Sequence, residues 1–252
     1  MLAVLNNAKQ ILKAKGYLVY QRPWQLNIVA FRSRFLRSNA FDDWLIVFYR
    51  NDGGKWVYHH FPCTTDPGQY WLDNPMHPKG TAFLKANQYV DSYAIGFHKA
   101  SYEALVQVKP VTVIRDYDRG GLFNWFSSGY PDTGLFGINV HRATANGTSV
   151  QVDSYSAGCI VLANSTDFAI LMKLARVHKS LYGNRFTLTL IDYRDRRKRM
   201  LSTVAWGAAL ASTAFMGYQL YNNYEAIEKY QKGGIGRSRK PGRIGYRQMA
   251  EV

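Results

Sequence analysis

Short runs of β-branched and aromatic residues, separated by turn residues, fill the first two-thirds of this chain and constrain its fold most strongly. Residues 44–49 and 55–60 flank the turn Asn51-Asp52-Gly53-Gly54, a pattern that predicts a β-hairpin. Short strands at this density indicate a mainly β fold, a sandwich or a barrel. Further strands are predicted at 24–31, 92–97, 104–108, 111–115, 135–140, 160–162 and 186–191.

Helices are expected only around this β structure. Residues 2–14 follow a loosely amphipathic pattern that predicts an N-terminal helix. Asn164-Ser165-Thr166-Asp167 is typical of a helix start, with a helix continuing to about residue 177. We therefore expect an N-terminal helix in 1–16 and a β-rich domain in 17–193.

The chain changes character after this domain. Residues 200–221 contain no charged side chain and would form a helix about 33 Å long, near the thickness of a bilayer core. Large apolar side chains all around this helix favour a membrane span from Met200 to Tyr221. Its Ser and Thr residues favour the alternative, a helix buried in a protein assembly. We expect this basic flank and apolar helix in 194–224, followed by a basic tail in 225–252.

Composition fits one globular domain with such appendages. The chain has 252 residues, of which 47% are hydrophobic and 15% aromatic, so it can bury a sizeable core. Its formal charge of +15 points to anionic lipid, anionic cell-wall polymers or virion nucleic acid as counterparts. No base-reading module is apparent, so nucleic acid is not expected as a specific partner. The N-terminus carries no signal peptide pattern.

Cys159 and His141 are the candidate catalytic residues. Cys159 ends the run Ser156-Ala157-Gly158-Cys159 and follows His141 by 18 positions. A thiol attacks a carbonyl carbon as the thiolate, so a nucleophilic cysteine needs an imidazole within hydrogen-bond reach. Each of the two residues adjoins a predicted strand, and two strand ends can bring their side chains together. Gly158 leaves room for a substrate carbonyl, and nearby backbone N–H groups can stabilise an oxyanion.

This constellation resembles the catalytic motif of L,D-transpeptidases, the YkuD-type domain, in which a His precedes a Ser/Thr-His-Gly-Cys signature by about this interval. The resemblance implies a β-sandwich or barrel with Cys159 as nucleophile and His141 as general base. It further implies that the backbone carbonyl of Arg142 orients the imidazole, and that Ser156 and Gly158 shape the turn. No cofactor and no metal are implied.

Two positions depart from that pattern. Ala157 stands where the family usually has His, and Val161 stands where it usually has Asn or Arg. Both positions affect contacts on the substrate side, so the choice between hydrolysis and transpeptidation stays open.

Residues 17–192 also resemble a group of uncharacterised proteins common in bacteriophage genomes. Residues 61–68, 111–118, 139–143 and 156–159 carry this similarity. It implies a virion protein at a membrane or at the apparatus that breaches the host cell wall, with other virion proteins as partners.

Simpler explanations exist for the same residues. A free cysteine is often a small core residue, and a Cys63–Cys159 disulfide is an alternative for both cysteines. A metal site is disfavoured, because adjacent His59 and His60 point to opposite faces of a strand. His98 is either a substrate-groove residue or a half-exposed strand histidine.

Two functions of different class follow. The first is a cysteine peptidase or transpeptidase that acts on peptidoglycan stem peptides through an acyl-enzyme, with hydrolysis favoured for a virion protein. The second is an inactive virion structural or membrane-anchoring protein on the same scaffold. Retention of both Cys159 and His141 favours the enzyme.

Overall fold

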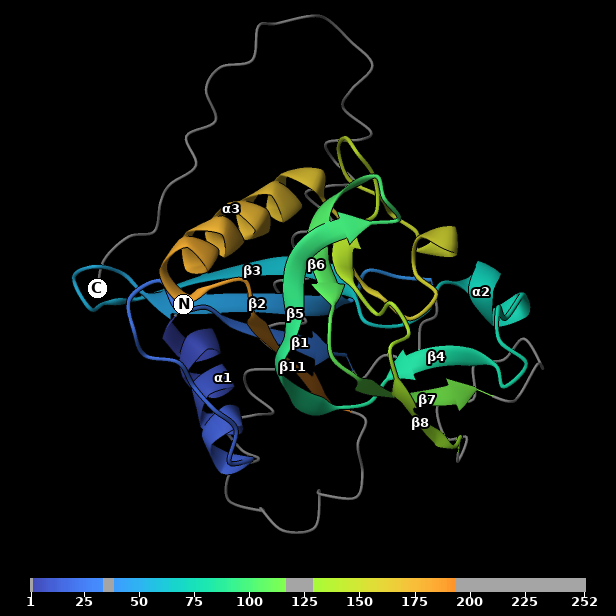
Figure 1. Ribbon diagram of the computed structural model, residues 1–252, viewed down its shortest axis with the longest axis horizontal. Coiled ribbons are helices and arrows are strands. Elements are labelled where there is room, and N and C mark those ends of the chain that lie inside the picture. Colours follow the sequence, from blue (N-terminus) through green and yellow to red (C-terminus); the bar gives the residue numbers. More distant parts are fainter. Residues whose placement is uncertain (1, 34–38, 117–128, 194–252) are drawn as a thin grey trace, which may run out of the picture. The chain divides into compact units, whose positions relative to one another are not determined.

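The computed structural model describes residues 2–33, 39–116 and 129–193, and these are mainly β structure (Figure 1). The described residues from 12 to 193 form one compact unit, whereas residues 2–11 belong to a second, so helix α1 (Leu2–Ala14) is described by itself. Leu5, Ala8 and Leu12 are buried along one face of α1, at helical spacing.

Eight strands form a sheet closed into a barrel in the order β1-β11-β5-β6-β9-β10-β3-β2. The strands are β1 (Asn27–Arg32), β2 (Asp43–Arg50), β3 (Trp56–Thr64), β5 (Asn87–His98), β6 (Tyr102–Gln107), β9 (Val140–Arg142), β10 (Ile160–Leu162) and β11 (Phe186–Asp192). A separate three-stranded sheet joins β4 (Thr81–Leu84), β7 (Val111–Asp116) and β8 (Pro131–Gly134). The mainly β class predicted from the sequence is therefore confirmed for the described residues.

The predicted hairpin is present. β2 and β3 are antiparallel, with Asp43 opposite Cys63 at one end and Arg50 opposite Trp56 at the other. Asn51 closes the turn, because its backbone N–H donates to Lys55 O at 2.8 Å. Turn residues between two alternating apolar runs thus produce the longest pairing of the barrel.

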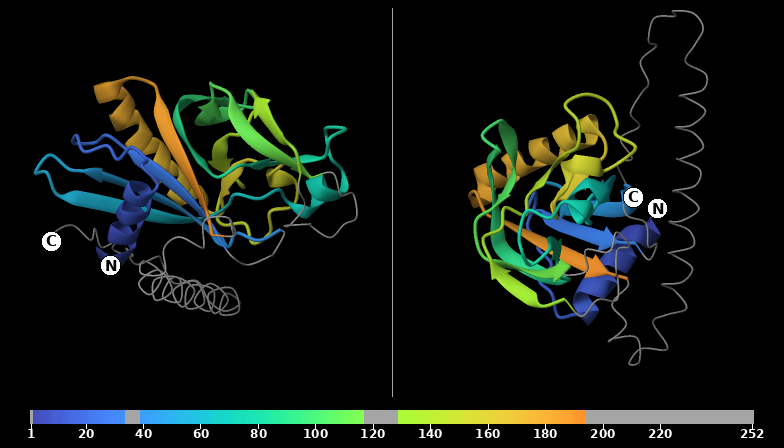
Figure 2. Two further views of the ribbon diagram at one scale, coloured as in Figure 1. Left: turned by 90° about the horizontal axis from the view of Figure 1, so that it is seen from below. Right: turned by 90° about the vertical axis from the view of Figure 1, so that its right-hand side faces the viewer.

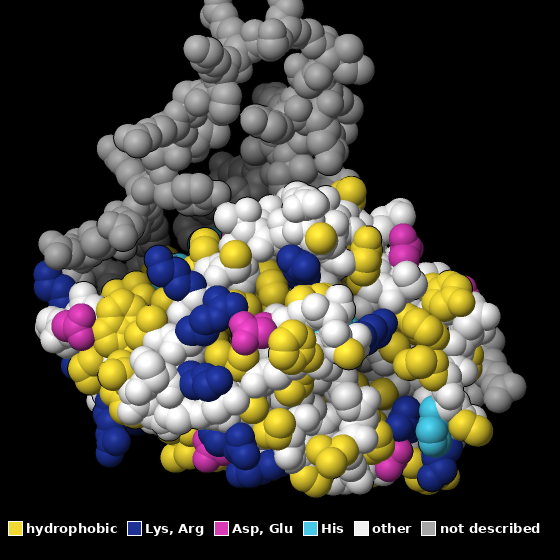
Figure 3. All heavy atoms as spheres, turned by 45° about the horizontal axis from the view of Figure 1, so that its top comes forward, with side chains coloured by type: hydrophobic (Ala, Val, Ile, Leu, Met, Phe, Trp, Pro, Cys, Tyr) yellow, Lys and Arg dark blue, Asp and Glu magenta, His cyan; other side chains and the backbone are white. Residues whose placement is uncertain are grey.

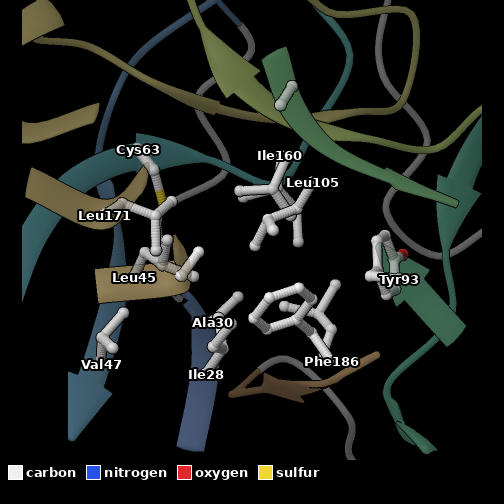
Figure 4. Packing of buried hydrophobic residues seen from close by; sticks show 14 of the residues in the cluster. Ile28, Ala30, Leu45, Val47, Cys63, Tyr93, Leu105, Ile160, Leu171 and Phe186 are labelled. Carbon is white, nitrogen blue, oxygen red and sulfur yellow. The ribbon is translucent and has the colours of Figure 1, made fainter. Parts of the chain in front are cut away.

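Apolar side chains from all sides fill the barrel (Figure 4). Ile28 and Ala30 of β1, Leu105 of β6 and Ile160 of β10 point into this core, which Phe186 of β11 closes on one side. At 25 cal/mol per Å², burying each large aliphatic side chain contributes about 1.5–3 kcal/mol. The core therefore fixes the faces of β9 and β10, the two strands that adjoin the candidate site.

Two further helices and one 3-10 turn complete the unit: α2 (Gln69–Asp73), η1 (Asp153–Tyr155) and α3 (Ser165–Tyr182). Asn164 caps α3 as predicted, since its side-chain oxygen accepts from Thr166 N at 2.7 Å and Asp167 N at 3.1 Å. The helix runs five residues past the predicted end, and Gly183 terminates it. Figure 2 shows α3 alongside the barrel strands, and Leu171 and Ala175 of α3 belong to the same apolar core as the side chains of the strands.

A buried arginine ties β1 to the ends of other strands. Arg32 forms ion pairs with Asp66 at 3.0 Å and Asp192 at 3.1 Å. Its guanidinium also donates to Thr65 and to Leu84 O. Because Leu84 ends β4, this network connects the three-stranded sheet to the barrel.

The strand predicted over residues 135–140 is wrong in its bounds. Only Val140 belongs to a strand, β9, and residues 135–139 form a loop. Gly137 has φ +71, which interrupts an extended run. The side chain of Gln107 replaces a strand partner by accepting from Phe136 N at 3.1 Å and Ile138 N at 3.0 Å.

The predicted helix Met200–Tyr221 and the basic tail lie outside the described residues. Among the described helices, none is long and apolar enough to cross a bilayer.

Candidate active site

Strands β9 and β10 bring the two candidate catalytic residues to one face of the sheet. The strands are parallel, with Val140 opposite Ile160 and His141 opposite Val161. Val140 and Ile160 point into the core, so His141 lies on the opposite face. Cys159 precedes Val161 by two residues and therefore shares that face with His141.

The turn before Cys159 is built by Ser156. Its hydroxyl donates to Cys159 O at 2.9 Å and accepts from Gly158 N at 3.2 Å. Ser156 is fully buried, and its own carbonyl accepts from Gly68 N at 2.8 Å. These bonds fix the backbone on both sides of Cys159.

Gly158 is required by the fold of the chain itself. Its φ is +122, and a Cβ at this position would overlap the carbonyl oxygen of Ala82 on β4. The space that we expected a substrate carbonyl to use beside Gly158 is thus taken by Ala82. The interpretation of this glycine from the sequence was wrong in that respect.

The Cys159 thiol is half-buried and makes two weak hydrogen bonds. Sγ accepts from Asn139 N at 3.4 Å, and the S–H group is directed at Gly137 O at 3.4 Å. Burial raises the pKa of this thiol, while the Asn139 N–H group opposes the rise. The resting group is therefore a thiol.

One backbone donor is available beside the sulfur. Within the described residues the N–H of Cys159 has no hydrogen-bond partner, whereas the N–H of Gly158 is taken by Ser156. An oxyanion formed at Cys159 can use this single free donor.

His141 is buried, with 3% of its surface exposed. Its Nδ1 lies 2.9 Å from Arg142 O and 3.3 Å from the hydroxyl of Tyr102, which itself donates to Arg142 O at 3.2 Å. A carbonyl oxygen only accepts, so Nδ1 carries the proton and Nε2 has a free lone pair. The Arg142 carbonyl thus makes the contact that the family resemblance implies.

The lone pair of His141 Nε2 is available for a proton. Nε2 is buried and has no hydrogen-bond partner among the described residues. Burial, followed by the neighbouring His98, lowers the pKa of His141 to about 3. Sγ and Nε2 do not bond each other, which is common before substrate binds. The resting pair is a neutral thiol and a neutral imidazole.

Three residues that the sequence did not single out as catalytic complete the site: His98, Tyr102 and Asn139. His98 stacks on His141 with ring centroids 4.0 Å apart and planes 19° apart. Asn139 contacts both Cys159, through its backbone, and His98, through its side chain at 3.0 Å. The guanidinium of Arg142 lies over the Tyr102 ring at 4.4 Å. Only the proximity of His98 to a predicted strand end gave a signal in the sequence.

Cys63 lies elsewhere. It is fully buried in the core on β3, beside Leu162 on the neighbouring strand, and both cysteines are free thiols (Figure 4). The alternative Cys63–Cys159 disulfide is therefore absent. His59 and His60 stack on aromatic rings of the β2–β3 hairpin. In the part of the chain described, no three His, Cys, Asp or Glu side chains gather as metal ligands.

Comparison of the chain with known protein families, curated proteins and solved structures finds no match. The chemistry proposed below rests on the geometry of these side chains.

Proposed function

We propose that this protein is a cysteine-dependent peptidoglycan peptidase, with Cys159 as nucleophile and His141 as general base. The barrel, in this proposal, is of the L,D-transpeptidase type, and the substrate is the stem peptide. The supporting observation is the shared face of Cys159 and His141 on β9 and β10, with His141 Nδ1 held by Arg142 O. This arrangement leaves Nε2 unprotonated, as a base must be.

The first half of the reaction transfers the acyl group to sulfur. Nε2 of His141 takes the thiol proton as Sγ of Cys159 attacks the amide carbon, and the N–H of Cys159 donates to the developing oxyanion. The imidazolium then gives its proton to the leaving amine as the C–N bond breaks. Because the resting thiol is neutral, Nε2 removes the thiol proton at the same time as Sγ attacks the substrate carbon.

The second half releases the product. His141 takes a proton from water or from an amine, which attacks the thioester carbon, and the thiol leaves with that proton. Water completes a peptidase cycle, and an amine completes a transpeptidase cycle. Val161 is fully buried and apolar, so the position where the family usually has Asn or Arg offers no polar group to bind an acceptor amine. Ala157 offers none either, which favours hydrolysis.

The surface charge is compatible with cell-wall polymers. Lys and Arg side chains lie among hydrophobic ones on the face in Figure 3, where acidic side chains are fewer. Such a surface attracts anionic polymers at low ionic strength. Together with the phage resemblance, this supports a virion enzyme that opens the wall during infection.

Defined muropeptides test the proposal directly. The full chain is incubated with tetrapeptide and cross-linked muropeptides, with and without an added amine, and the products are analysed by mass spectrometry. We expect cleavage of a stem-peptide bond by the unmutated chain and by Cys63→Ala, and none by Cys159→Ala. Exchange with the amine would identify a transpeptidase. No reaction under any condition would favour the inactive virion scaffold.

A further inference from the structure

His98 is placed against the candidate base in a way that the proposed mechanism does not yet use. It ends β5, is 7% exposed, and its ring is stacked on His141 at 4.0 Å. Two histidines in this arrangement cannot both be charged without strong repulsion. One of the two rings has to stay neutral while the other exchanges a proton.

Asn139 determines which ring stays neutral. Its side-chain oxygen accepts from Gln107 N at 2.9 Å, which fixes the orientation of the amide. The amide nitrogen therefore faces His98 Nδ1 at 3.0 Å and donates to it. His98 Nδ1 must be an unprotonated acceptor, so a neutral His98 carries its proton on Nε2.

Other groups around the two rings also favour a neutral His98. Burial lowers the pKa of His98, and Lys99, the next residue in the β5–β6 turn, lowers it further. From β6 the hydroxyl of Tyr102 faces His141 Nδ1, and from β9 the Arg142 cation lies over the Tyr102 ring. Near this pair of rings no carboxylate is bonded to either His98 or His141 within the described residues. Nothing there favours a charged His98.

We propose that His98 is a positioning residue for His141: Asn139 keeps the His98 ring neutral, and that ring holds the plane of His141 while His141 gains and loses the Cys159 proton. A neutral ring stacked on an imidazolium stabilises it through its π face, whereas a protonated ring would repel it. This inference builds on the proposed roles of Cys159 and His141, and it does not depend on the substrate.

The tautomers give the first test. Long-range proton–nitrogen NMR spectra of the ¹⁵N-labelled full chain at neutral pH distinguish the two ring nitrogens of each histidine, with signals assigned from His98→Phe and His141→Ala spectra. We expect the Nε2–H tautomer for His98 and the Nδ1–H tautomer for His141. A charged His98, or a His98 with its proton on Nδ1, would overturn the proposal.

Three variants give the second test, with the alkylation rate of Cys159 by iodoacetamide as readout. His98→Ala removes the stacked ring and should lower the rate about tenfold or more, as displaced catalytic groups do. His98→Phe restores a ring and should recover most of that loss. Asn139→Asp keeps the acceptor for Gln107 N but favours a protonated His98, so its rate should fall further as the pH is lowered from 8 to 6. Equal rates for His98→Ala and the unmutated chain contradict the proposal.

The tests of His98 and the test of the proposed function can fail independently of each other. A chain that leaves muropeptides unchanged but shows the expected tautomers and alkylation rates would retain the His98 role with a different substrate. A chain that cleaves muropeptides and is unaffected by His98→Ala would retain the proposed function and lose this inference. Backbone NMR spectra of each variant show whether it is folded, and only folded variants are used to assign the histidine signals or to compare alkylation rates.

Discussion

The hydroxyl of Ser156 donates to the carbonyl oxygen of Cys159 at 2.9 Å, across the tight turn that presents the Cys159 thiol. The Ser156 hydroxyl oxygen also accepts from Gly158 N at 3.2 Å. A single buried side chain thereby fixes the peptide group before Gly158 and the one after Cys159, and leaves the N–H of Cys159 free to face an oxyanion.

Ser156→Ala is expected to destabilise the fold and impair the site. It leaves a buried carbonyl and a buried N–H without their partner, each costing about 1–3 kcal/mol. Chemical denaturation measures the loss, and Cys159 alkylation measures the effect on the thiol. Ser154→Ala is the matched control, because Ser154 is exposed on the neighbouring turn η1. Equal stability of the two variants would contradict the role given to Ser156.

Gly158→Ala tests the close approach between the catalytic turn and β4. The new Cβ meets Ala82 O, and φ +122 is strained for alanine, so we expect a loss of at least about 2 kcal/mol. Gly147→Ala is the control, since Gly147 also has a positive φ, +74, but an open Cβ position. It should lose about 1 kcal/mol. Thermal unfolding of both variants shows whether the contact with Ala82 O adds to the backbone strain, in which case Gly158→Ala loses more stability than Gly147→Ala.

The pH dependence of alkylation tests the resting state of the pair. Because burial raises the pKa of Cys159 and lowers that of His141 to about 3, the neutral thiol predominates at pH 7. The rate should therefore rise with pH through the alkaline range. Cys63 is fully buried with its pKa raised further, so Cys159 should react first at every pH.

His141→Ala should slow the alkylation of Cys159 at neutral pH, although Cys159 should still react before the fully buried Cys63. A rate that stays constant from pH 5 to 8 would instead indicate a preformed thiolate–imidazolium pair, and equal rates for the two cysteines would argue against an activated nucleophile.

Arg32→Met tests the ionic network between the barrel and the three-stranded sheet. The substitution leaves Asp66 and Asp192 without their cation. Breaking a buried ion pair in this way typically lowers the free energy of unfolding by about 3–5 kcal/mol. Arg115→Met is the control, because its partner Asp132 is 30% exposed and can be solvated. We expect the larger drop in denaturation midpoint for Arg32→Met. The reverse order would show that solvation of Asp132 does not offset the lost pair.

The sequence predicted the parts of the fold that local patterns control. The hairpin of β2 and β3 follows from its turn residues, and α3 begins at the cap provided by Asn164. The parallel pairing of β1 with β11 has no local signal, since the two strands are far apart in the chain. The loop at residues 135–139 depends on Gln107, a side chain on another strand. Long-range hydrogen bonds of this kind leave no periodicity to detect.

The candidate site was predicted in its central residues and missed in its surroundings. Spacing and the Ser-x-Gly-Cys turn led to Cys159 and His141, which β9 and β10 place on one face. His98 and Tyr102 reach His141 only because β6 pairs with both β5 and β9. The environment of a base is therefore set by sheet order, which the sequence alone did not reveal.

The most direct test of the central claim is the covalent intermediate. The full chain is mixed with muropeptides, quenched with acid within seconds, and digested for peptide mass spectrometry. We expect an acyl adduct on the peptide that contains Cys159 and none in Cys159→Ala. In His141→Ala, an adduct forced with an activated ester should persist longer than in the unmutated chain, because His141 no longer activates the attacking water. Turnover of muropeptides by Cys159→Ala, or an adduct on Cys63 alone, would contradict the account.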